Sequence, residues 1–140
     1  MSTSIRAYWF GRDTLPHGDG RPVAVGVTHT VEPPIVPCER GLHASVHPAD
    51  ALTYAKCATL WLVELGGTIA EESDKLAASE RTYLACIDAT KILHTYARWC
   101  TSQVLHLWDA PDVDWITARE AQRAHLLGLV EAAFRDQGVK

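Results

Sequence analysis

The chain has 140 residues, a length that fits one domain with one hydrophobic core. Its 47% hydrophobic and 21% charged residues exclude a disordered tail, because enough apolar side chains are present to offset the entropy of folding. The net charge is -4, and Lys and Arg are scattered singly. A nucleic-acid partner is therefore not expected, since a nucleic-acid groove needs clustered positive charge.

The N-terminal residues 1–6 are not followed by the apolar run of a secretory signal. No apolar segment approaches the roughly 18–20 residues that cross a bilayer, so no membrane association is expected. We therefore expect a cytoplasmic protein whose cysteines are reduced and mostly buried. These cysteines are Cys38, Cys57, Cys86 and Cys100.

The first 88 residues favour a sheet. β-branched and aromatic residues predict strands at 5–10, 22–31, 41–45, 58–65 with a continuation over 68–70, and 81–88. The segment 48–56 predicts a short helix between strands, with Ala51, Leu52 and Ala55 on one face.

The remaining residues, 89–138, favour two helices. Apolar residues recur at three- and four-residue spacing from Ala89 to Trp108, and the segment 109–112 ends that helix. Thr117 and Glu120 have capping-box spacing, which predicts a terminal helix to about Gly138. The predicted fold is a single α+β domain over 1–140: a mixed, mostly antiparallel sheet, one short inter-strand helix and two longer C-terminal helices.

The stretch from Cys38 to Ala55 is the most distinctive, with the element Cys38-Glu-Arg-Gly-Leu-His43 at its start. Together with Leu107-Trp-Asp-Ala-Pro111, it resembles a family of small proteins of unknown function from bacteriophages and actinobacteria. The resemblance spans roughly residues 5–112. It implies a phage or mobile-element origin, with the host cytoplasm as the place of action, and it names no reaction.

The same region, extended to Glu64, also resembles the NAD-dependent ADP-ribosyltransferase fold. Gly41-Leu-His-Ala-Ser45, Ala51-Leu-Thr-Tyr-Ala55 and Trp61-Leu-Val-Glu64 follow the order of strand, helix and glutamate-bearing strand in that fold. The resemblance implies that Arg6 or Tyr8 stands near the nicotinamide ribose, that Ser45 and Tyr54 line the dinucleotide pocket, and that a carboxylate such as Glu64 stabilises oxocarbenium charge. The opening strand lacks a clear His or Arg signature, and the late glutamate motif is missing.

Nucleophilic and metal chemistry are the remaining options. Ser45 lies two residues from His43, so both side chains share one face of a strand, with Leu42 and Ala44 on the other. The pair could be a nucleophile and its base or simply part of the core. Cys38, His43, His47 and Cys57 have the ligand types that zinc prefers, but no Cys-x-x-Cys spacing. We expect no metal.

Five tryptophans are present, and Trp99, Trp108 and Trp115 lie in or between the predicted C-terminal helices. They are candidates either for core packing or for a binding surface, where Trp is enriched. The first hypothesis is a phage-type accessory protein that binds and modulates a host or defence protein without a cofactor. The alternative is an ADP-ribosyltransferase-like enzyme that uses NAD. The sequence leaves the oligomeric state open.

Overall fold

The computed structural model describes residues 4–107 and 114–139 and confirms the α+β class. A mostly antiparallel sheet is followed by two C-terminal helices, with one short helix between strands. The elements are β1 (Ile5–Phe10), β2 (Thr28–Thr30), β3 (Leu42–Ala44), α1 (Pro48–Leu52), β4 (Thr59–Glu71), β5 (Leu76–Asp88), α2 (Thr90–Leu107) and α3 (Trp115–Asp136).

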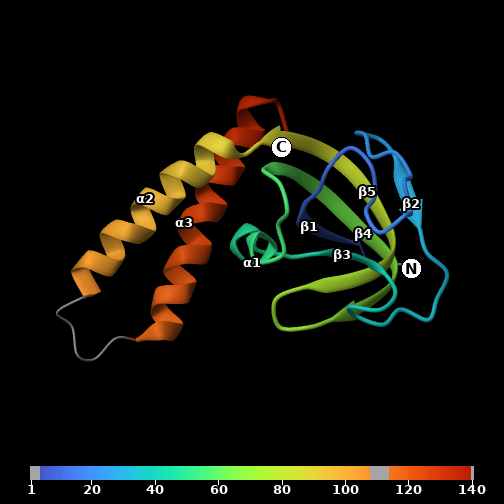
Figure 1. The fold of residues 1–140 in the computed structure, drawn as a ribbon, viewed down its shortest axis with the longest axis horizontal. Coiled ribbons are helices and arrows are strands. Elements are labelled where there is room, and N and C mark those ends of the chain that lie inside the picture. Colours follow the sequence, from blue (N-terminus) through green and yellow to red (C-terminus); the bar gives the residue numbers. More distant parts are fainter. Residues whose placement is uncertain (1–3, 108–113, 140) are drawn as a thin grey trace.

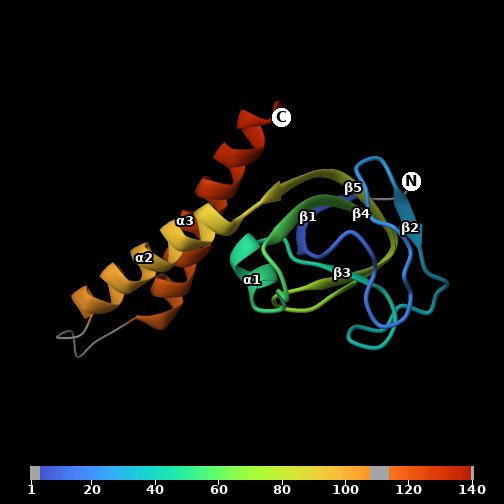
Figure 2. The same cartoon turned by 45° about the horizontal axis from the view of Figure 1, so that its top comes forward.

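The sheet curls so that β1 meets the residue after β3. The strand order is β1-β4-β5-β2, and β3 also pairs with β5, beyond the stretch that pairs with β2. The residue after β3, Ser45, exchanges two backbone hydrogen bonds with Tyr8 of β1, at 2.7 and 2.9 Å. This pairing joins β3 to β1, so four strands enclose a common interior, as the curved ribbons in Figures 1 and 2 show.

Alternating side chains on the strands fill two separate hydrophobic clusters. Trp61 and Val63 of β4 point into the enclosed interior with Leu42 and Ala44, as the two-residue period of a strand predicts. On the opposite face, Leu60 and neighbouring apolar residues pack against the helices, and the buried side chains of α3 are Leu126, Val130 and Phe134.

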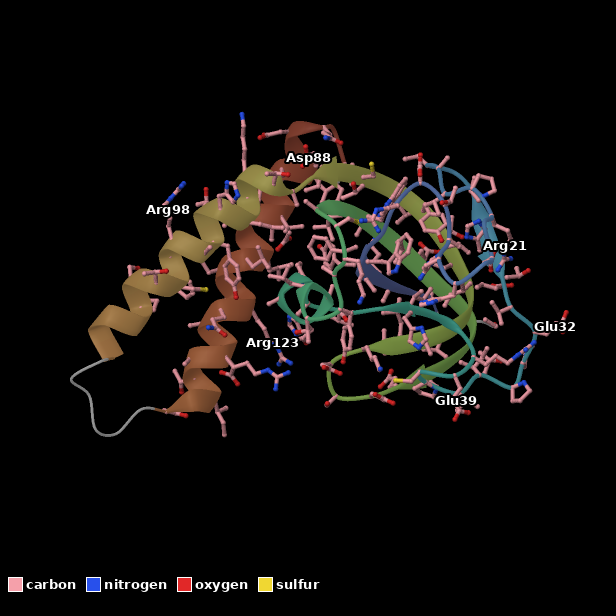
Figure 3. The ribbon with its side chains drawn as sticks, in the orientation of Figure 1. Arg21, Glu32, Glu39, Asp88, Arg98 and Arg123 are labelled. Atoms are coloured by element: carbon pink, nitrogen blue, oxygen red, sulfur yellow. The ribbon has the colours of Figure 1, made fainter. Side chains whose placement is uncertain are left out.

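The helical layer lies to one side of the sheet. α2 and α3 form a hairpin that extends away from the strands, and α1 lies between this hairpin and the sheet (Figure 1). Asp50 in α1 is only 6% exposed and accepts hydrogen bonds from Arg123 of α3 at 2.9 and 3.2 Å. Arg119 lies 3.6 Å from the same carboxylate, and Figure 3 shows Arg123 directed from α3 toward α1. The ion pair between Asp50 and Arg123 therefore links α1 to α3.

Four predicted boundaries were wrong. The second strand is limited to 28–30, because a turn precedes it. The Val27 N–H donates to the Ala24 carbonyl across this turn, and Gly26 within it has a φ of 92°. α1 ends at residue 52 rather than 56. β5 begins at Leu76, since the small residues 77–79 and their neighbours are held in the strand by pairing with β3 and β4 rather than by local propensity.

The fourth error concerns the start of the terminal helix. Asp114 is the N-cap of α3, and its carboxylate accepts hydrogen bonds from the backbone N–H groups of Ile116 and Thr117. Thr117 therefore lies inside the helix, and the predicted capping box does not form.

The Asp50 ion pair predicts a specific loss of stability. Asp50→Asn removes the charge that two arginines face and leaves the half-buried Arg123 without its counterion. We expect the free energy of unfolding to fall by about 1–3 kcal/mol, as measured by urea denaturation. Glu120→Gln, on the exposed surface of the same helix, is the control and should change stability by less than about 0.5 kcal/mol. Equal stability of the two variants would contradict this role for Asp50.

Candidate functional site

The main cavity is an open cleft of about 650 Å³. Its walls come from β1, the segment 11–19 that follows it, β3, the end of α1 and the residues after it, with Lys75 and Arg81 from the β4–β5 hairpin. The walls are mainly apolar. They come from segments that are distant in the sequence and become neighbours only because the sheet closes.

The charge of the cleft is opposite to that of the whole chain. The chain carries a net charge of -4, but the cleft is lined by Arg12, Lys56, Lys75 and Arg81 and by one acidic residue, Asp19. The Asp19 carboxylate already forms an ion pair with Arg21, at 2.8 Å. The cleft therefore favours an anion over a cation.

Arg81 is the most unusual of these cations because its residue is only 2% exposed. Among the residues that the structure describes, no carboxylate lies within ion-pair distance of it. Its guanidinium stacks on the Trp9 ring at 4.1 Å and donates hydrogen bonds to the Tyr83 hydroxyl and the His43 carbonyl. Burial lowers the pKa of Arg81, but an arginine stays protonated in proteins. The described residues thus hold a positive charge away from water and supply no counterion for it.

A hydrogen-bond chain fixes the orientation of Arg81. His29 Nε2 donates to the Pro22 carbonyl at 2.9 Å, so the other ring nitrogen, Nδ1, accepts from the Tyr83 hydroxyl at 2.8 Å. The same hydroxyl accepts from Arg81 Nε and Nη2 at 3.0 and 2.9 Å. Every hydrogen-bonding direction of this buried hydroxyl is occupied, so the guanidinium is held rigidly.

Trp9 can cover Arg81 because Gly11, two residues further along the chain, has no side chain. A Cβ added at Gly11 would lie 2.0 Å from the Trp9 ring, so only glycine lets the indole fold back at this point. The Gly11 carbonyl in turn accepts from Trp61 Nε1 at 2.8 Å. The positions of both indoles therefore depend on this short segment.

A second set of polar contacts lies in the outer part of the cleft. The Cys38 backbone N–H donates to His43 Nε2 at 3.1 Å, and the Lys75 ammonium donates to the Cys38 thiol. Lys75 also lies over the Tyr54 ring at 4.9 Å, and the Tyr54 hydroxyl donates to Asp74 at 2.7 Å. The hydrogen bond to Asp74 raises the pKa of Tyr54, and the contact with Cys38 raises the pKa of Lys75.

The structure brings some of the predicted site residues together and separates others. His43, Ser45 and Tyr54 all line the cleft, although Ser45 is only 2% exposed. Arg6 and Glu64 are register partners on β1 and β4, and neither lines the cleft. Arg6 instead lines a smaller cavity, of about 360 Å³, between β1 and α3.

The candidate tryptophans of the helical hairpin are described only in part. Trp99 is half-buried and stacks on His125, with ring centroids 4.2 Å apart, and on Tyr96 at 6.2 Å. Trp108 lies outside the described residues. Trp115 begins α3, and its side chain is not described.

The candidate metal ligands do not form a cluster. Cys38, His43 and Cys57 line the cleft, but within residues 4–107 and 114–139 no three His, Cys, Asp or Glu side chains could hold a metal ion together. All four cysteines are free. Cys38 is exposed and the other three are half-buried, so the expectation that most of them are buried was wrong.

Arg81 and Trp9 were not predicted as site residues. The signal available was the pattern Arg81-Thr-Tyr83, in which a charged residue and a tyrosine occupy the same face of a strand. Their partners, residues 9, 29 and 43, are distant in sequence, and only the closed sheet shows that this face is the interior.

The fold and the cleft define a small α+β domain with a cationic, mainly apolar cleft. A family model described as a domain of unknown function, DUF7666, matches residues 21–95, and the chain belongs to this family. The match is narrower than the expected 5–112: it includes Cys38, His43, Tyr54 and Arg81 but neither β1 nor the 107–111 segment. No curated protein and no solved structure matches the chain. Among the described residues, no helix is long and apolar enough to cross a membrane.

The buried His29 and the half-buried His43 predict how stability depends on pH. Burial lowers the pKa of both His29 and His43 below the usual 6.5. Between 6.5 and these lowered values the unfolded chain binds more protons than the folded one, so stability is retained above pH 6.5 and lost as the pH falls. Urea denaturation at pH 7.5, 6.5 and 5.5 measures this loss.

A variant of His29 and a control variant test whether the buried His29 ring contributes to the loss of stability at low pH. His29→Gln should lower the free energy of unfolding at pH 7.5 by about 1–3 kcal/mol, since Tyr83 and Pro22 lose a partner, and should flatten the pH profile. His94→Gln, at an exposed position on α2, should keep the profile of the natural chain. A flat profile of the natural chain over this range would contradict the prediction.

Proposed function

We propose that this protein is a binding module whose cleft takes a small organic anion. The observation that carries the proposal is the buried charge of Arg81, which has no carboxylate partner among the described residues. Removing a cation from water costs several kcal/mol unless an opposite charge and hydrogen bonds compensate it. Trp9 and Tyr83 supply part of this compensation, and an anion in the cleft would supply the rest.

The dimensions of the cleft favour a small molecule. Its volume of about 650 Å³ lies within the roughly 300–1,000 Å³ of typical ligand sites. Aromatic rings line the cleft, with Trp9 beside the buried Arg81 and Tyr54 exposed to solvent. A ligand that combines an anionic group with an apolar or aromatic body fits this lining.

Binding of a host or defence protein stays a prediction from the sequence, as do phage origin and cytoplasmic location. The cationic cleft supports a small anion more directly than a protein surface, because its deepest cation is enclosed.

ADP-ribosyl transfer with NAD also stays a prediction. His43, Ser45 and Tyr54 line the cleft, as that resemblance implies, but the carboxylate that it assigned to stabilise positive charge, Glu64, does not. The acid that does line the cleft, Asp19, is paired with Arg21. Binding is therefore better supported than catalysis.

Nuclear magnetic resonance titration tests the proposal. The Arg81 Nε–H and Trp9 indole signals of the natural chain are followed during addition of two matched pairs: benzoate with benzamide, and AMP with adenosine. We expect at least one anion to shift both signals saturably at concentrations where its neutral partner does not, because the buried guanidinium recognises charge. The absence of any difference between anions and neutral partners would overturn the proposal.

The same protein is incubated with NAD as a second arm. We expect no release of nicotinamide. Release that is lost in Tyr54→Ala and kept in Tyr96→Ala, a tyrosine of α2 outside the cleft, would overturn the binding-only proposal in favour of the transferase.

A further inference from the structure

We infer that the anion recognised at Arg81 is a carboxylate with a single negative charge, carried on an apolar body. The inference rests on the proposed function and specifies its ligand class. It follows from three observations: how many charges the site must balance, which donors remain free, and what lines the space beside them.

The first observation is that Arg81 is the one cleft cation that is buried without a counterion, among the residues described. Lys75 has the Glu72 carboxylate at 3.8 Å and the Cys38 thiol beside it. Arg12 and Lys56 are exposed, so water solvates their charges. One positive charge inside the cleft therefore lacks compensation, and one negative charge neutralises it.

His43 adds no second positive charge. Its Nε2 accepts the Cys38 N–H, so a neutral ring carries its proton on Nδ1. Burial and the neighbouring charges of Lys75 and Arg81 lower the pKa of His43, which keeps it neutral at pH 7. A dianion would thus bring one uncompensated negative charge into a space that is lined mainly by apolar atoms.

The second observation concerns the donors. A guanidinium has five N–H groups, and Arg81 uses one on each nitrogen: Nε and Nη2 to Tyr83, and Nη1 to the His43 carbonyl. Among the described residues, no acceptor is found for the second N–H of either terminal nitrogen. Two donors on neighbouring nitrogens match the two oxygens of a carboxylate.

The Tyr83 hydroxyl is not available as a third donor, because it donates to His29 and accepts twice from Arg81. A phosphate monoester has three terminal oxygens and carries about -1.5 to -2 charges at pH 7. The buried end of the cleft offers fewer donors and less positive charge than such a group requires.

The third observation is the apolar surroundings of Arg81. Trp9 covers one face of the guanidinium, and Leu15, Leu42 and Ala44 also line the cleft. These side chains offer contacts to rings or hydrocarbon and no hydrogen bonds. The space beside the charge therefore fits an apolar body better than a sugar.

Three probes that share one ring system test the head group: 2-naphthoate, 2-naphthyl phosphate and the neutral 2-naphthamide. Isothermal titration calorimetry of the natural chain at pH 7.5 measures the Kd of each. We expect the Kd of 2-naphthoate to be at least tenfold lower than that of either other probe. Saturable shifts of the Arg81 Nε–H signal by 2-naphthoate should locate the binding at this residue.

Two variants with the same change in net charge separate the site from the overall charge. Arg81→Gln should abolish the preference for naphthoate over naphthamide. Arg98→Gln should preserve it, since Arg98 points outward from α2 and does not line the cleft (Figure 3). If Arg81→Gln fails to fold, the three-probe comparison on the natural chain and the Arg81 signal decide the result.

The outcomes distinguish the two proposals. Tighter or equal binding of 2-naphthyl phosphate at Arg81 would overturn the carboxylate inference and support the broader proposal of an organic-anion site. If neither anion binds more tightly than the amide, both proposals are overturned. Binding of naphthoate that Arg81→Gln leaves unchanged would overturn the inference, because the anion would then lie elsewhere.

Discussion

The positive charge of Arg81 inside the curved sheet is the constraint around which the cleft is arranged. An arginine in this position needs an aromatic surface to cover it and acceptors to hold it, and the chain supplies Trp9, Tyr83 and the His43 carbonyl. These partners come from three different strands. The closure of β1 against the residue after β3 is what brings them to one place.

The helical layer has a different role, which is to cover the outer face of the sheet. The outer face of β4 and β5 presents apolar residues such as Leu60 and Ile87, which need cover because exposed apolar patches promote association. α1 and the α2–α3 hairpin provide it, and the Asp50 ion pair adds a polar connection at their junction. The helices support the sheet from outside without contributing polar groups to the buried end of the cleft.

Helices and strands could be predicted from the sequence where the pattern of apolar residues within one segment is enough to define them. The period of the apolar residues identified α2, and the alternation of Leu42 and Ala44 with His43 identified the face of β3 that enters the core. The residues 76–80 were missed as strand because Ala and Ser favour a strand only when partners on both sides complete the ladder. Their partners are up to 50 positions away, as in the pair of Thr30 and Glu80.

The candidate site shows the same limit. His43, Ser45 and Tyr54 could be grouped from one short stretch of sequence, and all three line the cleft. Arg81 could not be added to them, because a lone arginine on a strand is most simply placed on the solvent side. Glu64 was grouped with them by resemblance, but the alternation of β4 places it on the face opposite to Val63, which points into the interior.

The position of β1 in the sheet has a consequence for the order of folding. The β4–β5 hairpin joins neighbouring segments through a turn at 72–75, so it can form from local contacts. β1 pairs with residues 60–65 and meets Ser45, so it must wait for chain that is synthesised much later. Trp9 belongs to β1, so it reaches Arg81 only when this strand has paired. The cover that the Trp9 ring gives to the Arg81 guanidinium therefore depends on a pairing between segments that are distant in the sequence.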